Sequence, residues 1–280
     1  MMTPPSFAEI IVEGPEAQTF LHGQLAADVK AIAPAHWGYA CYCVPDGRVQ
    51  ALMMVAHASA EQWRLLLPAE LADGVLSRLQ RYRLRSRCSL ASSEVAIVAT
   101  VDPLAAAYRC AAFSWSVEAG AASALAPNLW SQQAELGIPW IVAASSELFL
   151  PQMLALERLQ AYSLRKGCFP GQEVVARIHY LGRSKRRLTR LSQVGGDLSV
   201  RAGDELGLVG HAQKLGTLVL IDPSSRTALA VLMEAAVAGM RLTVSTQERH
   251  ADFVIEGDVS ETISETMLNK SYVPQMAHGV

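Results

Sequence analysis

The stretch KGCFPGQEVVARIHYLGRSKRR, residues 166–187, specifies its local structure more strongly than any other part of the chain. Two glycines and a proline within six residues predict a tight turn whose backbone is set by these residue types. Residues 172–178 then predict a short helix, on which Glu173 and Arg177 stand four apart and can pair. The pattern therefore predicts a loop followed by a helix, with Cys168 at their junction.

Cys168 lies where such a unit favours negative charge. Free N–H groups at the start of the helix face the loop, and Lys166 is two residues away. Both features stabilise a thiolate, the form of cysteine that reacts and binds ligands. From the residues alone, an equally good interpretation is a glycine turn with a packed cysteine and a surface ion pair.

A basic run from Arg183 to Arg190 follows the helix. Runs of this kind often belong to a solvated strand or helix end. As a patch, the run would attract an anionic ligand such as a polyglutamate tail, or a tRNA. We expect any weak tRNA contact to use Arg183, Lys185, Arg186 and Arg187.

Upstream of residues 166–187, the patterns predict a mixed α+β region. They indicate a strand at 7–12, a helix from Glu16, and a strand pair within 38–55 joined at Pro45-Asp46-Gly47. A strand at 63–67, a helix at 69–82 and a strand–turn–strand unit at 84–100 follow. Residues 105–144 have little pattern, and a further helix is expected within 145–158, starting after Pro151.

Downstream, short strands separated by glycine turns predict a small antiparallel barrel. The strands are expected at 204–209, 216–221, 228–233 and 241–246. We therefore divide the chain into an α+β region of two interleaved subdomains (1–192), a barrel (193–249) and a polar tail (250–280). The tail is aperiodic and is expected to be flexible or an interaction arm.

Composition narrows the class of protein. The chain has 280 residues, 51% of them hydrophobic, and a net charge of −2, so no global field would draw it to nucleic acid or anionic lipid. No signal peptide and no membrane-length apolar window are evident, so we expect a cytoplasmic protein without membrane contact. Five cysteines, an odd number, argue against a disulfide framework. Cys41 and Cys43 lack the further ligands of a metal site, so no metal is expected.

At this point the sequence resembles a known family. Residues 166–173 with Arg177 resemble the K-G-C-[YF]-x-G-Q-E-x-x-x-R signature of the YgfZ-type folate-binding proteins, relatives of the glycine-cleavage T-protein. Five other segments are similar to the family in the same order: GPEAQTFLHGQLAADV (14–29), PDGR (45–48), YRLRS (82–86), GIP (137–139) and FLPQ (149–152). The likeness covers roughly residues 7–245.

The resemblance implies a T-protein-like (aminomethyltransferase folate-binding) fold of the α+β class, with a small C-terminal antiparallel β-barrel around a central funnel for tetrahydrofolate. It implies a role in the upkeep of iron–sulfur enzymes, including those that modify tRNA. Cys168 and Lys166 match the family's key functional pair. Glu157 is the expected counterpart of the T-protein acid that grips the pterin. The residues expected to shape the loop around Cys168 are Gly167, Gly171, Gln172, Glu173 and Arg177.

One departure from the T-protein limits the expected chemistry. The T-protein needs a carboxylate on the strand after its hairpin, but the strand here begins Arg48-Val49-Gln50-Ala51. General acid–base chemistry requires a titratable group, which glutamine does not have. Three hypotheses stay open: a folate-binding accessory protein with a functional Cys168, a folate-dependent one-carbon transferase, and a non-catalytic tRNA- or protein-binding module. The last would use the basic run and Arg190, joined by Arg78, Arg81, Arg83, Arg85 and Arg87.

Overall fold

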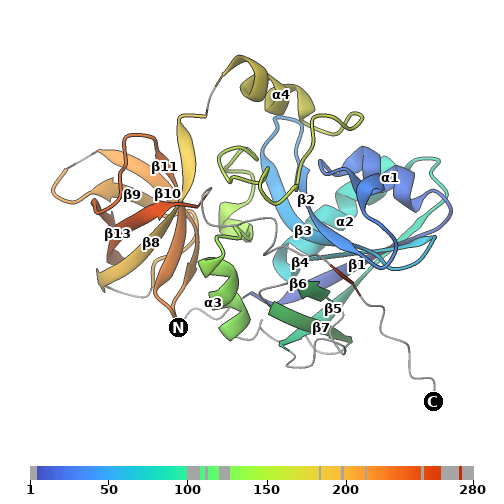
Figure 1. Cartoon of the computed structure of the whole chain (residues 1–280), viewed down its shortest axis with the longest axis horizontal. Helices are drawn as coiled ribbons and strands as arrows, with labels where there is room; N and C mark the ends of the chain where they lie inside the picture. The colour runs from blue at the N-terminus through green and yellow to red at the C-terminus, as the bar shows by residue number, and fades with distance from the viewer. Residues whose placement is uncertain are drawn as a thin grey trace.

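The computed structural model describes residues 5–99, 108–110, 113–119, 127–182, 184–196, 199–211, 213–246, 249–259 and 271–272. These residues form two β units, a large open sheet and a barrel, with helix α3 (Pro127–Glu135) between them and helix α4 (Gln172–Leu181) above them (Figure 1). The mixed α+β class and the C-terminal antiparallel barrel predicted from the sequence are confirmed.

The open sheet has eight strands in the order β14-β6-β7-β5-β1-β4-β3-β2. Its strands are β1 (Phe7–Glu13), β2 (Trp37–Cys43), β3 (Val49–His57), β4 (Gln62–Pro68), β5 (Ser89–Ala99), β6 (Tyr108–Cys110), β7 (Phe113–Ala119) and β14 (Ser271–Tyr272). Neighbouring strands pair antiparallel throughout. Strands β2 and β3 are buried along nearly their whole length, which explains their almost continuous run of apolar residues.

Helices α1 (Ala17–Gln24) and α2 (Ala69–Arg83) pack on this sheet, and short 3-10 turns η1 (Val29–Ala31) and η2 (Ala143–Ser145) complete the unit. Both helices bury an apolar stripe and leave the other side in solvent; on α2 the buried residues are Leu71, Ala72, Val75 and Leu79. This spacing is that of an amphipathic helix, as the sequence predicted.

The barrel closes from six antiparallel strands in the order β10-β11-β8-β13-β12-β9. They are β8 (Arg186–Gly196), β9 (Glu205–Leu208), β10 (Lys214–Asp222), β11 (Thr227–Met233), β12 (Arg241–Ser245) and β13 (His250–Asp258). On β11, Ala228, Ala230 and Leu232 fill the barrel, whereas Leu229 and Val231 pack into the core of the first unit. The barrel is therefore fixed to that unit through the outward residues of its own strands.

Two local expectations are wrong. Residues 84–88 form a turn and residues 89–99 form a single strand, β5, although two strands are expected within 84–100. Residues 151–160 form a series of turns instead of a helix, and Ala155 and Gln160 have positive φ angles of 50° and 55°. Leu154 and Leu156 are both fully buried, although two residues apart on a helix they would point in nearly opposite directions. Turns bury both, and a helix would not.

The barrel is also longer than predicted at both ends. β8 begins at Arg186, before the expected boundary at 193, and β13 occupies residues 250–258 of the supposed flexible tail. Ala251, Phe253 and Ile255 alternate inward on β13, which is the period of a half-buried strand. Further along the tail, Ser271 and Tyr272 pair with β6, and residues 260–270 and 273–280 lie outside the described residues.

Candidate functional site

The loop that carries Cys168 is seated on the β2–β3 hairpin. Gly171 has a φ of +78°, and a Cβ atom there would lie 2.4 Å from the Val44 carbonyl oxygen and 2.6 Å from the Gly47 Cα. Gly47 has a φ of +81°, and a Cβ atom on it would lie 3.1 Å from the Gly171 carbonyl oxygen. Both backbone angles favour glycine, and at Gly171 the contact with hairpin backbone atoms also leaves no room for a side chain. This close approach fixes the loop against the first unit.

Helix α4 begins directly after Gly171, as the sequence predicted, and continues three residues further, to Leu181. The Gln172 amide donates to the Phe169 carbonyl at 3.2 Å, which closes the turn before the helix. Arg177 pairs with Glu173 at 3.3 Å, so the predicted ion pair is confirmed. Both side chains of the pair are largely exposed, and the helix buries Val175 alone among its described residues.

Lys166 is buried beneath the loop. Its Nζ donates to the His22 carbonyl oxygen and lies 5.4 Å from the centre of the Phe169 ring. Burial lowers the pKa of Lys166 to about 8, and the nearby Asp28, Cys168 and Cys41 offset only part of that effect. Lys166 therefore holds a proton far less firmly than an exposed lysine, and it does so within the electrostatic reach of the exposed Cys168 thiol.

Two adjoining hollows open around this loop. The larger, which we call the funnel cavity, measures about 860 Å³, and the smaller, the thiol hollow, about 570 Å³. Leu164 and Tyr180 line both, so they form the boundary between the two. The thiol hollow is lined by Pro45, Leu164, Cys168, Phe169, Pro170, Gly171, Gln172, Glu173, Ala176 and Tyr180.

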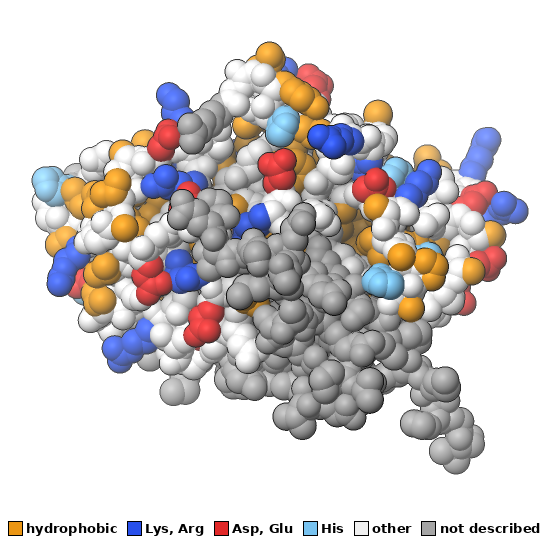
Figure 2. All heavy atoms as spheres, in the orientation of Figure 1, with side chains coloured by type: hydrophobic (Ala, Val, Ile, Leu, Met, Phe, Trp, Pro, Cys, Tyr) orange, Lys and Arg blue, Asp and Glu red, His pale blue; other side chains and the backbone are white. Residues whose placement is uncertain are grey.

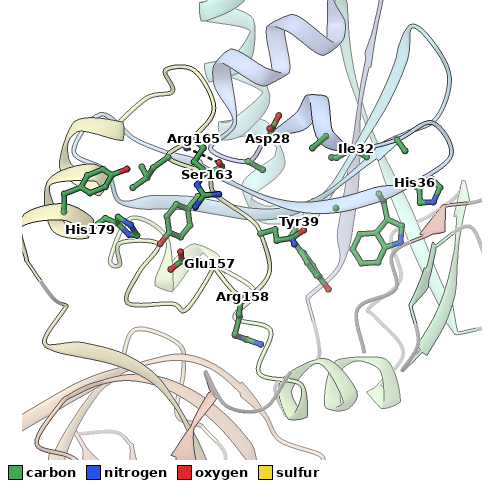
Figure 3. Close-up of a pocket in the computed structure, with 18 residues that line it drawn as sticks. Asp28, Ile32, His36, Tyr39, Glu157, Arg158, Ser163, Arg165 and His179 are labelled. Carbon is green, nitrogen blue, oxygen red and sulfur yellow. Dashed lines mark hydrogen bonds between the residues drawn. The ribbon is translucent and has the colours of Figure 1, made fainter. Parts of the chain in front are cut away.

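The funnel cavity combines aromatic faces with charges of both signs (Figure 3). Asp28 and Glu157 supply carboxylates, and Arg158 and Arg165 supply guanidinium groups. Figure 3 shows His179 of α4 on one side of the cavity and His36 on the other. The aromatic lining comes from Trp37, Tyr39, Tyr162 and Tyr180. Such a wall suits a ligand with a flat ring and both donor and acceptor groups.

Electrostatics link these wall residues. Burial raises the pKa of Tyr162, and the neighbouring charge of Glu157 raises it further, so the Tyr162 hydroxyl keeps its proton beside that carboxylate. Burial lowers the pKa of Arg158 to about 10, although its Nη atoms donate to the Leu136 and Gly137 carbonyl oxygens. Within the described residues, the buried Arg158 Nε has no hydrogen-bond partner.

The structure places the sequence-predicted site residues in different locations. Glu157 lines the funnel cavity, and Cys168, Gly171, Gln172 and Glu173 line the thiol hollow. Lys166 lies beneath the loop, Gly167 has no atom within 4 Å of where a Cβ would be, and Arg177 lines neither hollow. The sequence interpretation did not assign Asp28, Arg158, Tyr162 or Arg165. Asp28 lies in the quoted 14–29 segment, and Arg158 and Arg165 are next to the assigned Glu157 and Lys166.

The basic run is less open than the sequence suggests. Lys185 and Arg186 are exposed, whereas Arg187 lies 3.6 Å from Asp258 and donates to the Ala236 carbonyl at 3.0 Å. Arg190 donates to the Glu135 carbonyl at the end of α3, and Arg183 lies outside the described residues. On the face shown in Figure 2, acidic and basic side chains are interspersed, and hydrophobic side chains gather over α4.

Two further searches of the described residues concern other kinds of site. No group of three or more His, Cys, Asp or Glu side chains in that part of the chain is arranged to hold a metal ion. Cys41 and Cys43 are buried on β2 with their Sγ atoms 3.8 Å apart, which is the shared face that the alternation of a strand predicts. No described helix is both long and apolar enough to cross a membrane.

Comparison with known proteins supports the resemblance drawn from the motifs. The chain is 28% identical to the tRNA-modifying protein YgfZ of Serratia proteamaculans, covering 76% of this chain and 77% of that protein. It is 27% identical to the protein of that name from Klebsiella pneumoniae, covering 73% and 77%, and 26% identical to an uncharacterized protein of Haemophilus influenzae, covering 75% and 79%. The resemblance to YgfZ-type proteins is confirmed.

A solved structure confirms the fold that the resemblance to YgfZ implied. The glycine cleavage system aminomethyltransferase T from Bartonella henselae superposes with a TM-score of 0.64 over 96% of this chain and 88% of that chain. The two are 13% identical, so this likeness concerns the fold. No protein-family model matches the chain.

Proposed function

We propose that this protein binds tetrahydrofolate in the funnel cavity and supports the assembly or repair of iron–sulfur enzymes, including enzymes that modify tRNA. The observation that carries the folate part is the funnel cavity itself, which has the volume of a site for a drug-sized ligand and a mixed aromatic and charged wall. The T-protein fold and the likeness to tRNA-modifying YgfZ proteins support a folate-related accessory role.

The wall residues fit the chemistry of a folate. A pterin is a flat ring with several N–H donors on one edge. An exposed carboxylate such as Glu157 can accept hydrogen bonds from these donors. The glutamate portion carries carboxylates, which guanidinium groups bind in a planar fashion. Arg165 is exposed at the wall, and the buried Arg158 Nε lacks a partner among the described residues, so both have donors to offer. Bound tetrahydrofolate would supply a carrier for a one-carbon group.

Cys168 is proposed as the functional thiol, with Lys166 as its partner. The exposed thiol stands in the thiol hollow, across Leu164 and Tyr180 from the funnel cavity. When protonated, Lys166 favours the thiolate, and with its pKa near 8 it can also accept a proton close to neutral pH. Gly171 and Gln172 hold the loop in shape, and Glu173 with Arg177 stabilises the first turns of α4.

Glycine cleavage is disfavoured as the reaction. Gln50 takes the place where the T-protein has its carboxylate, and it lines neither hollow. Its amide nitrogen would lie 3.7 Å from a Cβ built on Gly74 of α2, so the side chain is turned toward that helix. Contact with tRNA, if direct, would use Lys185 and Arg186, which are the exposed members of the basic run among the described residues.

Two experiments test the proposal. Calorimetric titration with tetrahydrofolate is expected to give saturable binding. A titration without binding heat would contradict the proposal that the protein binds folate. Cys168→Ala is expected to retain that binding but to lose complementation, measured as the activity of iron–sulfur enzymes in cells that lack the protein. Full complementation by Cys168→Ala would remove the thiol part while leaving folate binding intact.

A further inference from the structure

The C-terminal end of α2 and the turn after it, residues 78–87, form a corner with an unusual surface. Leu84 is 84% exposed and Tyr82 is 45% exposed. Five arginines lie in the same ten residues: Arg78, Arg81, Arg83, Arg85 and Arg87. None of the corner residues lines the funnel cavity or the thiol hollow. We call residues 78–87 the α2 corner.

Leu84 adopts a backbone conformation that leucine normally avoids. Its φ is +45° and its ψ is −107°, a combination in which the Cβ atom of an L-residue is crowded and glycine is favoured. Strained conformations are usually stabilised by the surrounding packing or kept for function. At 84% exposure, the Leu84 side chain gains little packing within the described residues. The turn therefore holds an aliphatic side chain out into solvent at an energetic cost.

The turn that presents Leu84 is rigid. Glu16 accepts from the Arg87 amide at 2.8 Å and from Arg87 Nε at 3.0 Å. The Ser86 amide donates to the Arg83 carbonyl at 2.8 Å, and Arg83 Nη1 donates to the Cys88 carbonyl at 3.3 Å. Because the backbone is pinned at several points, a partner would lose little conformational entropy on this side when it binds Leu84.

The corner is also positively charged on a chain whose net charge is −2. Arg78 lies 3.6 Å from Glu147, and Arg87 pairs with Glu16. Arg81 and Arg85 are exposed and have no ion-pair partner among the described residues. The surplus of positive charge surrounds the exposed leucine, and it is complementary to an acidic surface.

We propose that the α2 corner docks a protein partner, whose surface offers an apolar pocket for Leu84 and an acidic rim for Arg81 and Arg85. An RNA backbone would account for the arginines but not for the leucine, since nucleobases stack on aromatic side chains. An anionic membrane would require more buried apolar area than one leucine and a half-exposed tyrosine. The proposal is independent of folate binding, because the corner is separate from both hollows.

Photo-crosslinking of the full chain in its own cells tests this proposal. The photo-reactive residue p-benzoylphenylalanine replaces Tyr82 in one version and Gln80, which is also exposed, in another. Cross-linked peptides are identified by mass spectrometry. We expect cross-links to a protein segment in which Asp or Glu residues flank apolar ones. In the same background, Leu84→Gly and the double variant Arg81→Glu/Arg85→Glu should each lower the yield at least about tenfold.

Controls separate docking from folding. Val237→Ser removes another exposed apolar side chain, and Arg241→Glu reverses an exposed charge on the barrel; both should leave the yield unchanged. Leu84→Gly should keep or raise the melting temperature, since glycine relieves the strain. The proposal is overturned if neither probe position cross-links to protein, if the yield is insensitive to both corner variants, or if the products are RNA or lipid.

Discussion

The funnel cavity and the thiol hollow share a boundary but are built by different parts of the chain. The funnel cavity is lined by residues 27–39, 157–165 and two residues of α4, segments far apart in sequence. The thiol hollow is lined mainly by one continuous stretch, residues 168–176. Most of its geometry is therefore set by a local loop seated on a hairpin, whereas the funnel cavity depends on the whole fold.

This difference predicts how each region responds to substitution. A change in the loop should act on the backbone of the thiol hollow, and a change in the wall of the funnel cavity should act on ligand affinity. The two regions should communicate only through Leu164 and Tyr180, which line both, and through the loop that passes from one to the other.

The largest effect is expected for Gly171→Val. The variant must place a branched side chain at a φ of +78° and 2.4 Å from the Val44 carbonyl oxygen. We expect a loss of about 3 kcal/mol or more in the free energy of unfolding, measured by urea denaturation. Gly167→Ala is the matched control, since a Cβ at Gly167 meets no atom within 4 Å. Equal, small losses in both variants would contradict the seating of the loop on the hairpin.

Lys166 should make stability depend on pH. Burial lowers its pKa from 10.5 to about 8, so between these values the unfolded chain binds more protons than the folded one. The contribution of Lys166 to stability therefore rises as the pH increases through this window. Relative to Lys166→Met, the wild-type free energy of unfolding should increase by up to about 3 kcal/mol between pH 7.5 and pH 10. A flat difference, or one that falls with pH, would contradict a buried lysine.

Glu157→Gln should separate the two hollows by ligand affinity. In the proposed complex, loss of the carboxylate would remove a charge-assisted hydrogen bond to the pterin, and we expect about a tenfold rise in the calorimetric dissociation constant for tetrahydrofolate. Glu173→Gln, on the wall of the thiol hollow, is the control and should change the constant less than about twofold. Equal effects of the two variants would contradict the assignment of the ligand to the funnel cavity.

The smallest effect is expected for Arg177→Ala. The pair with Glu173 is at 3.3 Å, but both side chains are mostly exposed. Its loss should lower the free energy of unfolding by about 0.3–0.5 kcal/mol at low salt, and by less at 1 M salt. A loss of several kcal/mol would mean that Arg177 does more than support the start of α4.

The same contrast between local and distributed structure explains what the sequence could predict. The Asp46-Gly47 hairpin, the Cys168 loop and α4 depend on neighbouring residues, and they were predicted close to their observed bounds. The expected helix after Pro151 failed because tertiary burial of Leu154 and Leu156 overrode local helix propensity. β13 has the alternation of a strand, but its polar outward residues resembled a flexible tail.

The candidate site divides in the same way. Most residues that line the thiol hollow can be identified as site candidates from one sequence motif. Glu157 can be identified only from the family resemblance. No local pattern indicates that Asp28, Tyr162 and Arg165 would face one cavity, because the fold brings them together from separate segments. The exposure of Leu84 could not be predicted from the sequence either, since leucine in an amphipathic pattern is normally expected to be buried.

The central claim is that a folate in the funnel cavity lies next to the Cys168 thiol, across Leu164 and Tyr180. The most direct test is the rate at which iodoacetamide alkylates Cys168, measured with and without saturating tetrahydrofolate, in wild type and in Glu157→Gln. The account predicts that the ligand changes the wild-type rate severalfold, and that Glu157→Gln needs about ten times more ligand for the same change. Saturable folate binding with no change in the alkylation rate would contradict it.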